Sequence, residues 1–267
     1  MGLNSITIPS SVKSIEPYTF HTCYGLTSVT IPNTVKSIGW AAFSYCNSLA
    51  SIAIPENVTF IDGFAFSDCS SLTSINIPDN VTSIEKYTFN GCSSLTSITI
   101  PSNVTSIGES AFSGCSGLTS INFPGGLLSI GDNSFRNCTG LASITIPSSV
   151  SSLGSHSFSN CTGLTSFIIP SNVTSIGNGI LSSCSSLQDV VVESGNPVYD
   201  SRDNCKAIIE TATNTMIAGF IFTDFPSSVT AIGNSAFYGC TGLTSMTIPN
   251  TVTKLGDYAF SGCNYEV

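Results

Sequence analysis

The sequence predicts a repeat solenoid that is mainly β, with short 3₁₀ or one-turn helical segments, and three observations support this. A unit of twenty-three residues, exemplified by residues 95–117, recurs along nearly the whole chain. In each unit apolar residues alternate as in a short half-buried strand, and a proline then ends the alternation. A fixed period of this length is typical of stacked supersecondary units that share one continuous core.

The first residue of each unit defines a single array. These lead residues are Leu3, Leu26, Leu49, Leu72, Leu95, Leu118, Leu141, Leu164, Leu187, Phe220 and Leu243. We therefore expect one solenoid of about eleven rungs over residues 1–267. The rung that starts at Leu187 is longer, and we expect it to carry a hairpin-containing insert at about residues 193–219.

Two short strands are expected in each rung. Counting the lead residue as zero, Ile98 and Ile100 occupy +3 and +5, and Pro101 at +6 lacks the N–H that a strand would need. Val104 at +9 and Ile107 at +12 form a second β-like run. We place parallel strands at about +2 to +5 and +10 to +12.

The remainder of each rung is expected to form an opposite wall. Gly108 at +13 suits a turn with positive φ, and Ala111-Phe112 is predicted to form a 3₁₀ or one-turn helix. Phenylalanine recurs at +17, where Leu181 replaces it once, and cysteine recurs at +20. Stacking should place each residue type above its own kind.

The combined pattern LxxIxIPxxVxxIxxxAFxxC resembles the BspA-like (Treponema pallidum-type) leucine-rich repeat family of bacterial and some protist surface proteins. The resemblance covers essentially the whole chain, and the insert NPVYDSRDN is similar to inserts of that family. It implies a right-handed leucine-rich-repeat superhelix with a parallel sheet on the concave face. It also implies an association with adhesion, although a fold alone does not establish a function.

The charge balance argues against several classes of partner. The chain has 7 Lys+Arg and 16 Asp+Glu, a formal net charge of −9, and only 9% charged residues. Such a surface lacks the basic footprint that nucleic acids and anionic membranes require. No apolar run approaches the ~18 residues of a membrane span, so no membrane insertion is expected.

The chain ends bear on localisation and on self-association. No signal peptide is visible, because the first residues already belong to a repeat. We therefore expect a fragment of a cell-surface or secreted protein; the alternative is a genuine cytosolic start. Without polar caps, the rungs at Leu3 and Cys263 should expose apolar core. End-to-end association of the chain is therefore predicted.

Ten of the eleven cysteines form the +20 column, such as Cys115. The favoured interpretation is a column of buried small hydrophobic side chains. Disulfides between neighbouring rungs and a metal site remain alternatives, although stacked side chains point the same way and no CxxC spacing occurs. Cys205 lies outside the column and is expected to be the most exposed cysteine.

The insert and its surroundings supply the candidate contact residues, because varied side chains gather only there. Asn196-Pro197 should turn the chain, and two apolar runs around Thr211–Asn214 predict a hairpin. The alternatives are a hairpin with merely solvated charges, or a weak calcium site, although the spacing does not match an EF-hand. The candidates are Asp189, Val191, Tyr199, Asp200, Arg202, Asp203, Phe222 and Asp224.

The exposed face of the first strands is predicted to be a lattice of small hydroxyls. Serine dominates +2 and threonine is frequent at +4, as in Ser97 and Thr99. This face is either simply solvated or a surface for an extended protein or glycan, and interruptions of the lattice argue against ice binding. Larger side chains appear only near the insert, which places any specific site in the C-terminal third.

The sequence offers no catalytic constellation. His21 and His156 stand in different rungs, no serine has a nearby His/Asp pair, and the glycines never gather into a phosphate loop. We therefore expect no catalytic residues, no cofactor and no metal. The predicted function is a non-enzymatic recognition or adhesion module for protein partners such as host or bacterial surface or matrix proteins; the alternative is a structural spacer or stalk.

Overall fold

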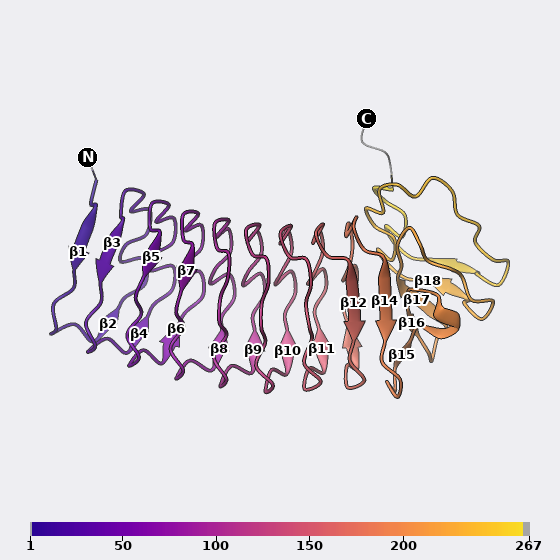
Figure 1. Ribbon diagram of the computed structural model, residues 1–267, viewed down its shortest axis with the longest axis horizontal. Helices are drawn as coiled ribbons and strands as arrows, with labels where there is room; N and C mark the ends of the chain where they lie inside the picture. Colours follow the sequence, from indigo (N-terminus) through magenta and orange to yellow (C-terminus); the bar gives the residue numbers. More distant parts are fainter. Residues whose placement is uncertain (1, 264–267) are drawn as a thin grey trace.

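The computed structural model describes residues 2–263 as an elongated solenoid in which each repeat makes one turn (Figure 1). The first rungs lie at one end of the long axis, and the rungs after the insert lie at the other. Within this range the strands are short, and the only helical element is the 3₁₀ segment η1 (Arg202–Asn204). The structure therefore confirms the predicted mainly β solenoid.

The first strand of each rung forms one wall, with neighbours parallel and displaced by one repeat, as in the pair Ser5 and Ser28. Side chains at +3 point into the core, and those at +2 and +4 point outward. Isolated bridges, such as the one between Asn76 and Thr99, continue this wall through the middle rungs. The strands are β1 (Ser5–Thr7), β3 (Ser28–Thr30), β5 (Ser51–Ile52), β7 (Ser74–Ile75), β12 (Ser166–Ile169) and β14 (Asp189–Val192).

The second strands build another parallel wall, in which the +12 side chains are mostly buried. They form the ladders β2-β4-β6 and β8-β9-β10-β11-β13, and β18 and β19 continue the series after the insert. The strands are β2 (Ser14–Ile15), β4 (Ser37–Ile38), β6 (Phe60–Ile61), β8 (Ser83–Ile84), β9 (Ser106–Ile107), β10 (Ser129–Ile130), β11 (Ser152–Leu153), β13 (Ser175–Ile176), β18 (Ala231–Ile232) and β19 (Lys254–Leu255).

Proline and asparagine organise the bend between the two strands. The Val104 N–H donates to the Pro101 carbonyl at 3.1 Å, and the same turn recurs in the other proline-containing rungs. The side-chain amide of Asn103 donates to the Asp79 carbonyl of the preceding rung at 2.7 Å. The same bond to the preceding rung recurs at Asn57, Asn80 and Asn172, each of which, like Asn103, is followed two residues later by threonine.

The wall opposite the first strands, here called the turn wall, is not helical, and this part of the prediction is wrong. Ser110 at +15 and Gly114 at +19 have φ of 53° and 77°, so the backbone alternates between right- and left-handed conformations. Alternation prevents a helix and turns N–H groups toward the next rung. Phe112 accordingly donates to Ser134 O at 2.8 Å, and Ser110 donates to Asp132 O at 2.8 Å.

The glycine at +13 has a different role from the one predicted. Gly108 is absent from the residues with positive φ, and its N–H donates to Ile84 O of the preceding rung at 2.7 Å. A Cβ atom at Gly108 would lie 2.7 Å from the backbone nitrogen of Lys86. The position needs glycine because neighbouring backbones approach closely there.

Phenylalanine and cysteine columns form the core behind the turn wall. The rings of Phe89 and Phe112 stack at 5.4 Å between centroids, and this stacking recurs from Phe20 to Phe158. Each thiol in the regular stack donates to a phenylalanine carbonyl one rung earlier, as from Cys115 to Phe89 at 3.2 Å.

The cysteines are free thiols, and nine of the eleven are buried. The interpretation as buried small side chains is confirmed for the regular rungs, whereas neighbouring cysteines are not bridged. Cys205, expected to be the most exposed, is fully buried. This prediction is wrong because Cys205, the residue directly after η1, belongs to the hydrophobic core.

The long rung builds an antiparallel addition to the second-strand wall. Strand β16 (Ile208–Glu210) is antiparallel to both β15 (Tyr199–Asp200) and β17 (Thr215–Ala218), and β17 then pairs in parallel with β18. The tip of the β16–β17 hairpin lies between Glu210 and Thr215. The insert thus starts a second sheet, β15-β16-β17-β18-β19, beyond the end of the β8–β13 ladder.

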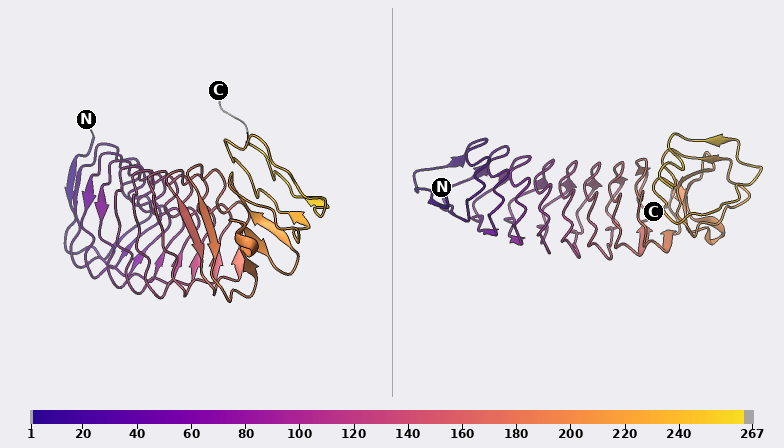
Figure 2. Two further views of the ribbon diagram at one scale, coloured as in Figure 1. Left: turned by 45° about the vertical axis from the view of Figure 1, so that its right-hand side comes forward. Right: turned by 90° about the horizontal axis from the view of Figure 1, so that it is seen from above.

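The long rung adds no segment to the turn wall, and this bends the molecule. The Ser183 N–H donates directly to Tyr238 O at 3.0 Å, although a whole rung separates these residues in sequence. On the turn wall, the rungs on either side of the long rung are therefore hydrogen-bonded directly to each other. On the strand walls, the insert separates them. Figure 2 shows the rungs after the insert turned relative to the regular stack.

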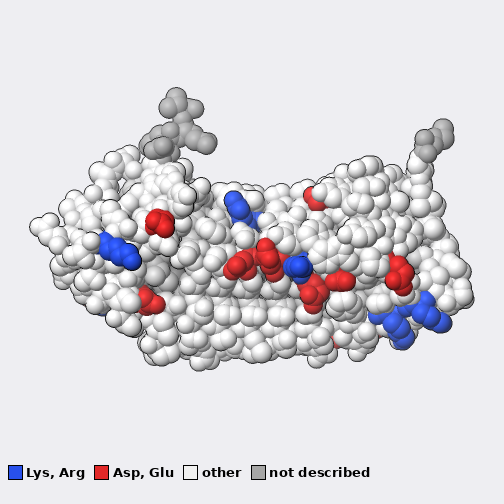
Figure 3. Space-filling model, turned by 180° about the vertical axis from the view of Figure 1, so that it is seen from behind, with Lys and Arg blue, Asp and Glu red and all other residues white. Residues whose placement is uncertain are grey.

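The molecular surface carries few charges, as the composition predicts. On the face opposite the view of Figure 1, acidic side chains form a broken row along the middle, and most of the remaining surface is uncharged (Figure 3). No helix within residues 2–263 has the length and apolar character needed to cross a membrane.

Candidate functional site

The exposed face of the first strands, here called the first-strand face, is uniform in the regular rungs. Ser28 and Thr30 are exposed and flank the buried Val29. Threonines at +1 turn their hydroxyls onto the main chain; Thr73 Oγ1, for example, donates to the Ala50 carbonyl at 3.2 Å. This part of the face therefore presents mostly small hydroxyl side chains, as predicted.

Larger side chains replace the lattice at β12 and β14. Ile168 and Val191 are direct neighbours in this parallel pair, and the two residues are 52% and 37% exposed. Asp189 lies opposite Ser166, two pairs earlier and on the same face. An apolar pair and a carboxylate thus occupy positions that are serine or threonine in most other rungs.

Asn196 fixes the start of the insert onto the preceding rung. Its side-chain nitrogen donates to Pro170 O at 3.0 Å and to Val173 O at 2.9 Å. Its side-chain oxygen accepts the N–H groups of Val198 and Tyr199 at 2.9 and 2.8 Å. The asparagine therefore determines where β15 begins.

Tyr199 was predicted to contact a partner, but the structure buries it, with only 6% of the residue exposed. Its hydroxyl accepts the Ile176 N–H at 3.0 Å. Because β13 is the last strand of its ladder, this N–H has no strand partner and takes the phenol oxygen instead. Tyr199 therefore ends a sheet and is removed from the candidate contact residues.

Asp200 and Arg202 hold the insert together. Arg202 Nη2 lies 2.7 Å from Asp200 Oδ2, and Arg202 Nε donates to Asp200 Oδ1 at 2.8 Å. Arg202 Nη1 also donates to the side chain of Asn214 at 2.9 Å, next to the hairpin tip. The hydrogen bonds to Asp200 raise the pKa of Arg202. Both groups are thus engaged within the insert.

A cleft opens where the strand walls separate. Strand β14 pairs only with β12, and residues 222–225 of the next rung form no strand with it. The segment after η1 is hydrogen-bonded to these residues: Asp224 N–H donates to Cys205 O at 3.1 Å, and Thr223 Oγ1 donates to Lys206 O at 3.3 Å. It therefore belongs to the same side of the cleft as Phe222.

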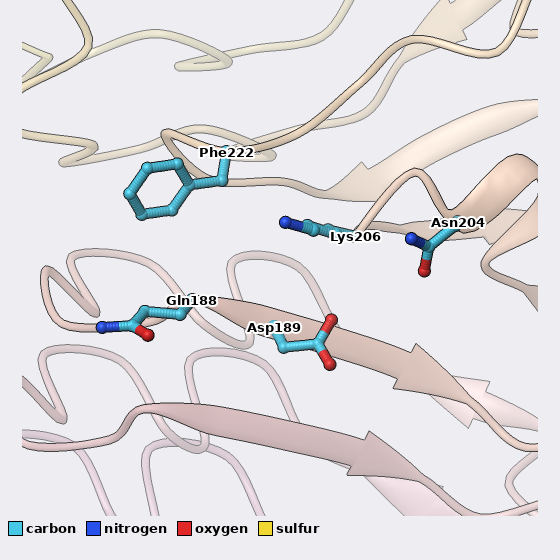
Figure 4. A pocket seen from close by; sticks show the side chains of 5 residues that line it. All are labelled: Gln188, Asp189, Asn204, Lys206 and Phe222. Atoms are coloured by element: carbon cyan, nitrogen blue, oxygen red, sulfur yellow. The ribbon is translucent and has the colours of Figure 1, made fainter.

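The cleft has a volume of about 580 Å³ and is lined by Gln188, Asp189, Asn204, Lys206 and Phe222. Gln188 and Asp189 project from the start of β14, and the other three face them from the opposite side (Figure 4). The cleft therefore lies between two segments that the insert holds apart.

The lining combines an anion, a cation, two amides and an aromatic ring. Phe222 is 51% exposed. The only ion pair within residues 2–263 joins Arg202 to Asp200, so the charges of Asp189 and Lys206 are not neutralised by each other in an ion pair. Aromatic residues are enriched in the core of protein-recognition surfaces, whereas charged groups such as Asp189 and Lys206 fit the polar rim of such a surface.

The structure brings together only part of the predicted residue set. Asp189 and Phe222 line the cleft, Val191 lies beside Asp189 on the same face, and Asp203 and Asp224 are exposed outside the lining. The predicted contact set left out three lining residues, Gln188, Asn204 and Lys206. Lys206 is one of the varied side chains that gather in the long rung, where it is the one lysine.

The histidines lie elsewhere, on the turn wall. His21 packs edge-on between Tyr18 and Tyr45, with ring centroids 5.6 and 5.8 Å apart. Burial, together with the nearby charge of Arg136, lowers the pKa of His156. Within residues 2–263 no group of three His, Cys, Asp or Glu side chains is arranged to hold a metal ion.

Sequence comparison identifies the repeat. The family model described as "BspA type Leucine rich repeat region (6 copies)" matches residues 1–119, 82–203 and 216–267. The chain belongs to this family. The unmatched stretch, 204–215, contains Asn204 and Lys206 of the cleft and most of the β16–β17 hairpin. No curated protein matches the BspA-type chain significantly.

Solved structures give the same fold. A leucine rich cell surface protein from Faecalibacterium prausnitzii is 30% identical, with a TM-score of 0.62 over 98% of this chain and 78% of that one. The pneumococcal vaccine antigen PcpA is 20% identical, with a TM-score of 0.57 over 98% of this chain and 62% of that one. The second likeness concerns the fold alone.

Proposed function

We propose that this BspA-type chain is a recognition module of a cell-surface protein, and that the cleft between β14 and Phe222 binds a protein partner. One observation supports this proposal above all: an exposed aromatic ring and charged side chains gather at the place where the repeat is interrupted. The family and the F. prausnitzii cell surface protein support a repeat module exposed outside the cell. The described residues offer no competing catalytic arrangement.

The lining suggests what the partner presents. Phe222 offers an apolar ring, and Lys206 and Asp189 offer one charge of each sign. Ile168 and Val191 extend the apolar surface along the strands. A peptide segment with an apolar side chain flanked by charged residues would be complementary to this surface. The hydroxyl lattice of the regular rungs would remain solvated.

The repeat itself supplies a substitution that removes the site without removing the fold. Asp189 and Phe222 both occupy +2, where most rungs have serine. Asp189→Ser with Phe222→Ser therefore restores the repeat consensus at two exposed positions. A matched control, Ser97→Asp, places a charge at +2 of a regular rung. Exposed replacements of this kind change stability little.

The test is selection of a random peptide library displayed on phage. Peptides should be enriched on the wild-type chain and on Ser97→Asp, and they should be lost on the Asp189→Ser/Phe222→Ser variant. Affinity of a recovered peptide should fall about tenfold or more in that variant, as expected for loss of an aromatic anchor. Peptides that bind all three proteins equally would contradict the proposed site. A failure to enrich any peptide would favour the spacer alternative.

A further inference from the structure

A second hollow lies on the turn wall and shares no residue with the cleft. Its volume is about 290 Å³, and it is lined by Arg136, His156, Ser159, Ser235, Tyr238 and Tyr258. These residues come from four rungs and stand at only two positions of the repeat, +15 and +18. The hollow is therefore built from the same two columns of side chains on either side of the interruption.

The interruption itself creates this hollow. The long rung adds no turn segment, so Tyr238 follows directly on Ser183 in the turn wall. The rung between the two sides contributes only Gly179 at +15 and Ser182 at +18. A Cβ atom at Gly179 would lie 2.5 Å from His156 Cε1, so the imidazole occupies the space over the glycine. A depression forms because the side chains in the middle are small and those on both sides are large.

One rim of the hollow is cationic and the other is aromatic. Arg136 is exposed, and the only ion pair within residues 2–263 is formed by Arg202 and Asp200. On the opposite rim, Tyr258 is 72% exposed and Tyr238 is 39% exposed. A guanidinium recognises a carboxylate through paired hydrogen bonds, and a phenol ring offers an apolar face with a polar edge.

The floor of the hollow is polar. Ser159 and Ser235 are 6% and 8% exposed and line it together with His156. Burial lowers the pKa of His156, which favours the neutral form of its ring. A neutral imidazole donates through one nitrogen and accepts through the other. Hydroxyls and a neutral imidazole can each both donate and accept, which matches the hydroxyl groups of a sugar.

We propose that this hollow binds a carboxylated sugar, with Arg136 pairing with the carboxylate and Tyr258 and Tyr238 lying against the ring. The volume is near the lower end of the ~300–1,000 Å³ that small-ligand sites occupy, which suits one or two sugar rings. The chain's net charge of −9 repels anionic ligands at long range. Selectivity for an acidic over a neutral sugar must therefore come from direct contact between the carboxylate and Arg136.

The experiment is calorimetric titration of the whole chain with digalacturonic acid and with its neutral counterpart, galactobiose. The acidic disaccharide should bind about tenfold or more tightly than the neutral one. Arg136→Gln should abolish this difference, and Tyr258→Ala should weaken binding of the acid about tenfold. Tyr18→Ala is the matched control, because Tyr18 occupies +15 in the first rung and is 56% exposed.

Two kinds of result would contradict the proposed sugar site. Absence of digalacturonate binding, or equal binding of the neutral disaccharide, would overturn the proposal. So would binding that Arg136→Gln and Tyr258→Ala leave unchanged. Circular dichroism of each variant verifies the fold, and because these side chains are exposed at the rim, their replacement should leave it intact.

Discussion

At the scale of single residues, the cysteine column shows how the repeat satisfies its backbone. The Phe89 carbonyl accepts the N–H of Cys92 from its own rung and the thiol of Cys115 from the next. The thiol fills a small space behind the phenylalanine ring and satisfies a buried acceptor. Serine would provide the hydroxyl, but it would bury a more strongly polar group. Cysteine combines an apolar volume with a weak donor.

This burial predicts that the protein is sensitive to alkali. Burial raises the pKa of Cys138 and Cys184 to about 12, above the ordinary value of 9.0. As pH rises above about 9, the unfolded chain loses thiol protons that the folded chain retains, so stability falls until the folded pKa is reached. Each such thiol can contribute up to ~1.4 kcal/mol per pH unit.

Urea denaturation between about pH 8 and 11 measures this effect, because that range spans the ordinary thiol pKa. The midpoint should fall steeply with pH, and Cys138→Ala with Cys184→Ala should reduce the slope while lowering stability at neutral pH. A midpoint independent of pH would contradict the burial of the column. If the urea midpoint of the alanine variant falls with pH as steeply as that of the wild type, groups other than these two cysteines, such as tyrosines, cause the loss of stability.

At the scale of elements, Tyr199 ends the β8–β13 ladder by accepting the Ile176 N–H at 3.0 Å. Tyr199→Phe should lower the free energy of unfolding by about 1–3 kcal/mol, because a partly buried N–H loses its acceptor. Tyr24→Phe is the control, since Tyr24 is 58% exposed. Urea denaturation compares the two variants. An equal effect of both would contradict the role given to the Tyr199 hydroxyl.

The regular elements were predictable because their side chains alternate with a fixed period. Strand positions and the apolar columns follow directly from residues such as Ile98 and Phe112. The turn wall was not predictable in the same way: its positive φ values occur at varied residues, including Ser110, and only some of them fall on a glycine such as Gly114. Gly108 was assigned to a turn because sequence alone cannot distinguish positive φ from close backbone approach.

The position of the candidate site could be proposed from the sequence, but the full set of residues that line it could not. The loss of the repeat located it near Asp189 and Phe222. Burial of Tyr199 and Cys205 depends on how the insert folds back against β13 and β14, which no local pattern encodes. The hollow near Arg136 was missed because it joins rungs that become neighbours only when the long rung adds nothing to the turn wall.

At the scale of the whole molecule, the terminal rungs differ from the interior ones. The lead residue Leu3 is 43% exposed, and Leu255 in the last rung is 56% exposed, whereas Leu95 is fully buried. We expect this 267-residue chain to associate end to end as its concentration rises, because each end offers apolar surface.

Light scattering over a concentration series tests this association. Leu255→Ser should shift the onset to higher concentration. Leu128→Ser is the matched control, since Leu128 is 52% exposed within the array and should not affect an end contact. A monomeric mass at every concentration, or equal effects of the two substitutions, would contradict end-to-end contact.

The central claim is that recognition takes place where the repeat fails and not on the regular lattice. Hydrogen–deuterium exchange of the chain, with and without a peptide selected on it, tests this most directly. We predict slower exchange in residues 187–192 and 204–222, with no change in residues 95–117. Protection confined to the regular first-strand face, or to the turn wall, would contradict the claim.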